Sequence, residues 1–149
     1  MARNNFAQTT TAAFALVAAT EKTLLQINNA TNILLVVTGA DITFDGVTNS
    51  AIPVVVKLIK VTTAGTGTAR NPLKVKDTST ALQVTGTENH SAEGTNGNLM
   101  RIFHVHPQAG VVYQIPMRDE IELATAERLA LKVTAPAAVN ALATIHGEE

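Results

Sequence analysis

Residues 52–61 read IPVVVKLIKV, and this stretch contains the pattern that decides the fold class. It is rich in β-branched residues, and successive side chains of an extended strand point to opposite faces. The alternation places Val54, Val56 and Leu58 on one face, and Val55, Lys57, Ile59 and Val61 on the other. Both faces are largely apolar, so we expect a long β-strand that is covered on both sides.

Shorter runs of the same kind recur along the chain, separated by Gly, Asn, Asp, Pro and Thr. The predicted strands are residues 14–18, 25–27, 33–37 with an extension through 42–44, 52–61, 73–75, 99–106, 111–115, 128–134 and 139–146. Residues 119–131 contain helix formers, but Leu129, Leu131 and Val133 alternate at period two, which favours a turn at 124–127 and a strand after it. We therefore predict one all-β domain over residues 1–149, a two-sheet β-sandwich of jelly-roll or Greek-key type with about eight strands.

The strand at residues 128–134 also predicts which side chains face solvent. Leu129, Leu131 and Val133 share one face, which we expect in the core. The other face carries Arg128, Lys132 and Thr134, and we expect it to be exposed to solvent.

Composition excludes several classes of function. The 149 residues carry a formal net charge of −1, and only 3% of them are aromatic, so neither a basic field nor stacking side chains favour nucleic acid. No apolar run approaches the ~20 residues of a membrane-spanning helix. The chain has no cysteine, which excludes disulfides and thiolate metal sites. The apolar run at 12–19 has only Arg3 as a charge before it and is expected to be a strand, not a cleaved signal.

Three polar segments are the expected assembly contacts. Residues 62–72 and 86–98 read as long exposed loops, which in compact domains usually carry binding contacts. Residues 1–10 (MARNNFAQTT) are too polar to be held by burial, so we expect an extended N-terminal arm docked on a neighbouring subunit, or else an ordinary edge strand. The candidate interface residues are Arg3, Asn4, Asn5, Phe6, Thr66, Arg70, Asn89 and Asn96.

His104 and His106 are the most specific candidates for a metal site. Two histidines two residues apart on a strand share one face and can bind one metal ion. The spacing resembles the HxH motif of the cupins, whose fold is also a jelly roll. Residues 107–111 lack the glutamate of that motif, and Asn98 stands where the family has glycine. We therefore expect surface or partly buried histidines and no metal or cofactor, with His90 and His146 as further ligands only if the fold brings them near.

No catalytic constellation is evident. None of the serines stands in a G-x-S-x-G motif, and the glycines at 65 and 67 are not followed by the GK[ST] of a phosphate-binding loop. Asp119, Glu120 and Glu122 lie beside Arg118 and read as a solvated charged face. The expected protein is not an enzyme.

Three segments carry a resemblance: HPQAGVVYQIPMRDEIEL (106–123), RLALKVTAPAAVNALATIHGEE (128–149) and TTAGTGTA (62–69). Together they resemble small structural proteins of tailed bacteriophages, of the head-decoration or cement type. The resemblance implies a β-sandwich or jelly roll and a symmetric homo-oligomer, a trimer or a dimer. It also implies docking on the major capsid protein at the outer surface of a virion, after synthesis in the host cytoplasm.

Two alternatives remain open from the sequence. One is a different virion role, as a tail, baseplate or fibre component, which the same composition fits. The other is a cupin-like metal-binding protein that uses His104 and His106.

Overall fold

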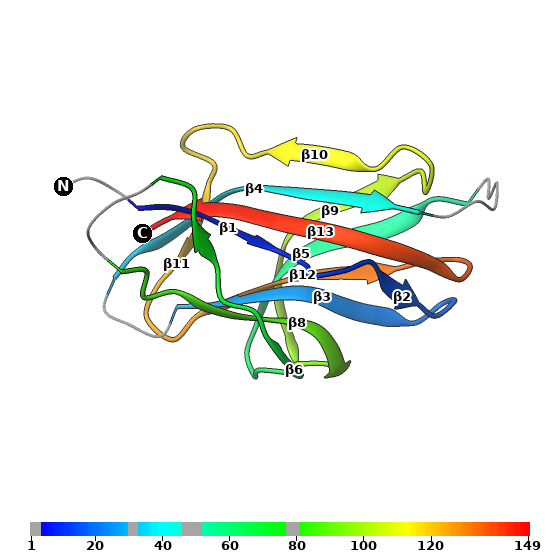
Figure 1. The fold of residues 1–149 in the computed structure, drawn as a ribbon, viewed down its shortest axis with the longest axis horizontal. Coiled ribbons are helices and arrows are strands. Elements are labelled where there is room, and N and C mark those ends of the chain that lie inside the picture. Colours follow the sequence, from blue (N-terminus) through cyan, green and yellow to red (C-terminus); the bar gives the residue numbers. More distant parts are fainter. Residues whose placement is uncertain (1–3, 30–32, 46–51, 77–80) are drawn as a thin grey trace.

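The computed structural model describes residues 4–29, 33–45, 52–76 and 81–149, and its regular structure there is entirely β-strand (Figure 1). The strands are β1 (Asn5–Thr9), β2 (Phe14–Leu16), β3 (Glu21–Asn28), β4 (Leu35–Phe44), β5 (Val54–Val61), β6 (Thr66–Ala69), β7 (Leu73–Lys74), β8 (Thr85–Ala92), β9 (Asn96–Val105), β10 (Val111–Gln114), β11 (Ile121–Leu123), β12 (Arg128–Thr134) and β13 (Val139–Glu148). No helix of the described residues is long and apolar enough to span a membrane.

Sheet A forms one layer of the molecule, with the strand order β10-β4-β13-β1-β7. Two short strands complete it: β11 follows β10 along one edge of β4, and β2 lies beyond β1 along one edge of β13. All pairings are antiparallel. Two short strands in succession thus take the place of one long strand beside β4, and again beside β13. Most of that edge of β4 and of β13 is therefore hydrogen-bonded to a neighbouring strand.

Sheet B forms the second layer, in the order β6-β8-β3-β12-β5-β9, again with antiparallel neighbours. In Figure 1 the sheet A strands β4 and β13 lie above the sheet B strands β12, β3 and β8. The prediction of an all-β protein with two antiparallel sheets is confirmed.

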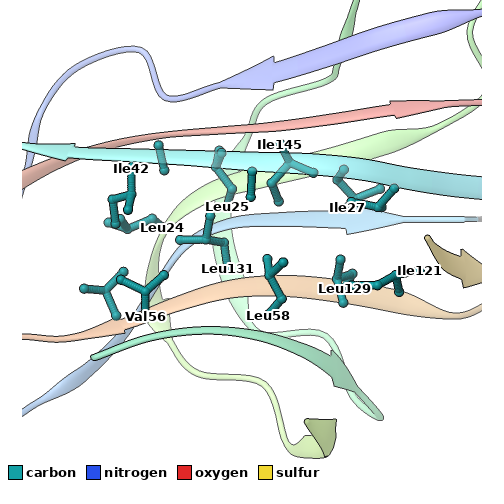
Figure 2. Close-up of a cluster of buried hydrophobic side chains, with 14 of the residues drawn as sticks. Leu24, Leu25, Ile27, Ile42, Val56, Leu58, Ile121, Leu129, Leu131 and Ile145 are labelled. Carbon is teal, nitrogen blue, oxygen red and sulfur yellow. The ribbon is translucent and has the colours of Figure 1, made fainter. Parts of the chain in front are cut away.

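The core lies between the two sheets, and Figure 2 shows its side chains meeting there. One face of β5 supplies Val54, Val56 and Leu58, as the alternation predicts, and all three are buried. On the other face Ile59 and Val61 are also buried and form a second, smaller cluster with Ala130 of β12. At these positions the chain itself covers both faces of the strand.

Thirteen strands in the described residues exceed the predicted number, and the two polar segments explain part of the excess. Residues 62–72 contain β6, and residues 86–98 contain most of β8 and the start of β9. The loop predictions for these segments were therefore wrong. Gly86, Glu88 and His90 alternate as buried residues on β8, a period of two that a search for apolar residues does not detect.

The turn predicted at residues 124–127 is present. The Glu127 amide donates to the Ala124 carbonyl at 3.0 Å, and Ala126 has a positive φ of 66°. This turn leads directly into β12, and no helix forms over residues 119–131.

The N-terminal segment belongs to the protein's own sheet. Residues Asn5–Thr9 form β1, which pairs with β13 on one side and β7 on the other. Phe6 is 1% exposed and lies in the core, so it is not available as an interface residue. Of the two predicted states of this segment, the described part adopts a strand of its own chain and not a docked arm.

Candidate functional site

The outer face of sheet A carries a hydrogen-bonded polar pair and two hollows. Alternation along β13 sends Ala141, Ala143 and Ile145 into the core, and therefore Leu142, Thr144 and His146 outward. The registers place Asp41 of β4 beside Thr144, Val112 of β10 beside Asp41, and Gly39 beside His146. These pairings bring Asp41, Val112 and His146 close together on one face.

A hydrogen-bonded pair lies near the centre of this face. Nε2 of His146 and Oδ2 of Asp41 are 2.8 Å apart, and both side chains are partly exposed. Gly39 stands opposite His146, and a Cβ there would lie 2.9 Å from the Tyr113 carbonyl oxygen. Glycine therefore lets β10 approach β4 closely, which keeps Val112 next to the pair.

Two hollows flank the pair. One, of about 320 Å³, is lined by Thr38, Gly39, Asp41, Val112, Tyr113, Gln114 and His146. The other, of about 130 Å³, is lined by Asp41, Ile42, Thr43, Leu142, Ala143 and Thr144. Asp41 lines both, and exposed apolar groups lie at their rims: Val112 is 74% and Leu142 is 39% exposed.

The Asp41–His146 pair offers polar groups to a partner at this face. The hydroxyls of Thr9 and Thr144, two residues of this face, hydrogen-bond to each other at 3.2 Å. A nucleophile activated by the Asp41–His146 pair would need to lie within hydrogen-bond distance of the imidazole. The pair is better placed to exchange hydrogen bonds with a partner that fills the hollows.

His104 and His106 occupy the far end of β9, on sheet B. His104 lies opposite Val55 and is exposed, and the exposed His106 follows the strand end, where its Nδ1 accepts the Gln108 amide at 3.2 Å. His90 is buried on β8 and His146 is on sheet A. Within the described ranges no group of three or more potential metal ligands forms.

The predicted interface residues are dispersed over several elements. Arg3 lies outside the described residues, Asn4 is 8% exposed, and Asn5 is half-buried on β1. Thr66 is exposed on β6, where its carbonyl accepts the Ser91 hydroxyl. Asn89 has a positive φ of 49° on β8.

The two remaining predicted interface residues, Arg70 and Asn96, serve internal contacts. The Arg70 side chain donates to the Thr9 carbonyl at 2.7 Å, and the Asn96 amide donates to a carboxylate oxygen of Glu21 at 2.9 Å. With the positions above, the described candidates lie on or beside β1, β6, β8 and β9.

Sequence reasoning missed a buried charge cluster on the outer face of sheet B. Lys132 is 1% exposed, and its Nζ lies 3.0 Å from Glu93 Oε2 and 3.5 Å from Glu21 Oε1. It also donates to the Gly94 carbonyl at 3.3 Å. The prediction that Lys132 faces solvent was wrong, because the connection between β8 and β9 crosses over it.

Both carboxylates of the cluster have further partners. Glu93 accepts hydrogen bonds from the amide and the hydroxyl of Thr23, and Glu21 is paired with Lys57 at 2.8 Å. Burial alone would raise the pKa of Glu21. The hydrogen bonds from Asn96 and Lys57, with the charges of Lys57 and Lys132, outweigh burial and hold that pKa below its usual value.

His90 is a second buried polar group. It is 4% exposed, and its Nε2 lies 2.8 Å from the Thr87 hydroxyl. A Cβ at Gly65 or Gly67 would overlap the imidazole, so the two glycines allow the chain to cover the ring. Burial lowers the pKa of His90; the charge of Glu93 opposes this effect and that of Lys132 adds to it.

Models of known protein families, curated proteins and solved structures were compared with this chain, and none of them matches it.

Proposed function

We propose that this chain is a non-enzymatic virion structural protein that decorates and stabilises a phage capsid as a symmetric homo-oligomer. Its partner is then the major capsid protein of the shell. The resemblance of residues 62–69, 106–123 and 128–149 to head-decoration proteins supplies the class of partner. The observation that carries the proposal is the outer face of sheet A, with its two hollows and exposed apolar rim.

This face has the features of a docking surface. Val112 and Leu142 supply apolar contact area, and the Asp41–His146 pair supplies polar groups between them. Interfaces of standard size bury about 800 Å² on each partner. The chain exposes 7627 Å² in all, so one broad sheet face is of the right order to supply such an area.

Attachment as an oligomer adds to the strength of each contact. Several copies that bind one shell together raise the overall affinity well above that of one interface, provided that the geometry allows simultaneous contacts. A modest interface on each subunit is then sufficient to stabilise the joints between capsid subunits.

Co-sedimentation with empty phage shells assembled from a major capsid protein tests the proposal. We expect the wild-type chain to pellet with shells, and Val112→Glu and Leu142→Glu to weaken this binding at least tenfold. Met117→Glu is the matched control, because Met117 is 87% exposed in the connection between β10 and β11, away from the hollows.

Two outcomes would contradict the proposal. Wild-type protein that stays in the supernatant with shells, or that binds purified tail tubes instead, would remove the capsid assignment. Equal effects of the control and the two face variants would remove the outer face of sheet A as the contact.

A further inference from the structure

β9 is a long strand at the edge of sheet B. It spans Asn96–Val105 and pairs with β5 on one side, and no strand of the described residues pairs with its other side. The remaining sheet edges are made by shorter strands, such as the four-residue β6 and β10 and the two-residue β7. A long unpaired edge presents a row of free backbone donors and acceptors that can pair with another strand.

The sequence of β9 carries only part of the usual protection of such an edge. Proteins block open edges with lysine, proline, β-bulges or inward-pointing charges. NGNLMRIFHV contains no lysine or proline, and Arg101 is its only permanently charged residue. The Arg101 side chain donates to the Tyr113 hydroxyl, the Met100 carbonyl and the Asp119 carbonyl, so it is held by this chain.

An irregularity in β9 gathers its two exposed apolar residues on one face. Leu99 lies opposite Ile59 and Ile102 opposite Lys57, with an extra residue in β9 between them. Residues three apart normally face opposite ways, but here both point to the outer face of sheet B, and each is 49% exposed. They extend the buried cluster of Ile59, Val61 and Ala130 toward the open edge.

We infer that this edge binds a second copy of the same chain, with the two β9 strands antiparallel about a twofold axis between Met100 and Arg101. In this register Leu99 faces Ile102 of the second copy, and Ile102 faces its Leu99. The two apolar pairs then lie on the same outer face, and the two edges form antiparallel hydrogen bonds on either side of Met100, whose carbonyl already accepts a hydrogen bond from Arg101.

Self-pairing fits this edge better than a foreign strand because the register is self-complementary. The twofold axis places Met100 opposite Arg101, so the two arginines do not face each other directly, and both are held toward Tyr113 of their own chain. The inference deepens the oligomeric part of the proposed function and commits it to a dimer. It does not use the contact with the shell.

Cysteine cross-linking tests the register, because the chain has no cysteine of its own. Directly opposed residues have Cβ atoms about 4.5–5.5 Å apart, close to disulfide geometry. We expect an oxidised mixture of Leu99→Cys and Ile102→Cys proteins to form a covalent dimer, and neither variant to form it alone. Leu99→Cys mixed with Val112→Cys is the control and is expected to remain uncross-linked.

Sedimentation measures the association itself. A strand-edge interface is expected to bury less than the ~1,200 Å² of stable complexes, so the association should be weak. The protein concentrations measured should therefore extend from about 1 to about 500 µM. We expect wild-type protein to approach twice the 15.6 kDa chain mass, and Leu99→Lys with Ile102→Lys to raise the dissociation constant at least tenfold. Val112→Lys should leave it unchanged.

The outcomes separate the two proposals. A 15.6 kDa species at every concentration, or no cross-link in the mixed sample, overturns the β9 dimer. Cross-links formed by either single variant alone overturn the register. A dimer that does not bind shells leaves this inference intact and overturns the proposed capsid function.

Discussion

At the scale of single residues, Lys132 shows how a buried charge is maintained in this protein. Its ammonium group has two carboxylates and one carbonyl within 3.5 Å, and one of those carboxylates, Glu93, is itself held by Thr23. Removal of one partner of a buried ion pair leaves an uncompensated charge, whereas an apolar residue of similar size leaves none. Removal of a carboxylate from the cluster should therefore reduce stability more than replacement of Lys132 by an apolar residue.

Glu93→Ala is expected to destabilise the protein by about 2–3 kcal/mol, since Lys132 keeps only one carboxylate, that of Glu21 at the longer distance, beside the Gly94 carbonyl. Lys132→Met should cost less, because it removes the buried charge together with the need to pair it. Urea unfolding at pH 7 measures both variants, with the exposed Glu122→Ala as control. A Glu93→Ala protein as stable as this control would show that the cluster contributes nothing.

His90 should make stability depend on pH. Burial lowers its pKa in the folded chain, so the unfolded chain binds a proton at higher pH than the folded chain does. The stabilising contribution of neutral His90 is complete above the ordinary histidine pKa of about 6.5 and falls as the pH decreases from there. Each unit of pKa difference corresponds to about 1.4 kcal/mol.

We expect His90→Gln to lose less stability than wild type when the pH falls from 7.5 to 5.5. The variant lacks the histidine whose protonation, at an ordinary pKa of about 6.5, favours the unfolded chain. Urea midpoints at the two pH values give the comparison. His104→Gln, at an exposed histidine, is the control for the loss of an imidazole. A His90→Gln slope equal to that of wild type would exclude His90 as the cause.

At the scale of elements, β1 and β8 show how polar strands are incorporated. Gln8 of β1 is fully buried, and its amide donates to the Arg70, Thr87 and Gln26 carbonyls at 2.8, 3.2 and 3.3 Å. Glu88 of β8 accepts the amide and the hydroxyl of Thr11. These contacts join the N-terminal strand of sheet A to sheet B, so β1 contributes to the sandwich and does not project from it.

Phe6→Ala tests this role of β1. A core phenylalanine costs about 3–5 kcal/mol on truncation to alanine, whereas a residue of a free arm costs almost nothing. Thermal or urea unfolding of the isolated protein measures the loss, and Thr9→Ala on the exposed outer side of the same strand is the control. Equal stability of the two variants would mean that β1 is not packed in solution.

At the scale of the whole molecule, the surface proposed for docking to a shell and the edge proposed for self-association lie on different sheets. The outer face of sheet A presents the Asp41–His146 pair and its hollows, and the β9 edge of sheet B presents Leu99 and Ile102. A substitution on one surface should therefore leave the other function unchanged. The two proposals together imply that copies pair through β9 and dock to a shell at the same time.

Dimerisation through β9 predicts a melting temperature that rises with protein concentration, because association stabilises only the folded chain. For a chain of this size each added kcal/mol corresponds to roughly 2–4 °C. Calorimetry on wild type and on the Leu99→Lys, Ile102→Lys double variant measures the effect. A wild-type melting temperature that is independent of concentration would count against the dimer.

The amino-acid sequence by itself determined the all-β class, the inner face of β5 and the turn before β12. Each rests on local information: alternation at period two places Val54, Val56 and Leu58 in the core, and the same alternation at 129–133 excludes a helix. Such patterns indicate which face of a strand is apolar wherever the strand lies in the fold.

Only the tertiary structure determined which polar side chains are buried and which partners they bind. Thr11 and Glu88 are 77 residues apart in sequence, and Thr23 and Glu93 are 70 apart, so no local pattern shows that these partners meet. The same applies to Asp41 and His146, which are neighbours only because β4 pairs with β13. A polar side chain is buried when a distant segment supplies its hydrogen bonds, and the packing of the two sheets determines which segment that is.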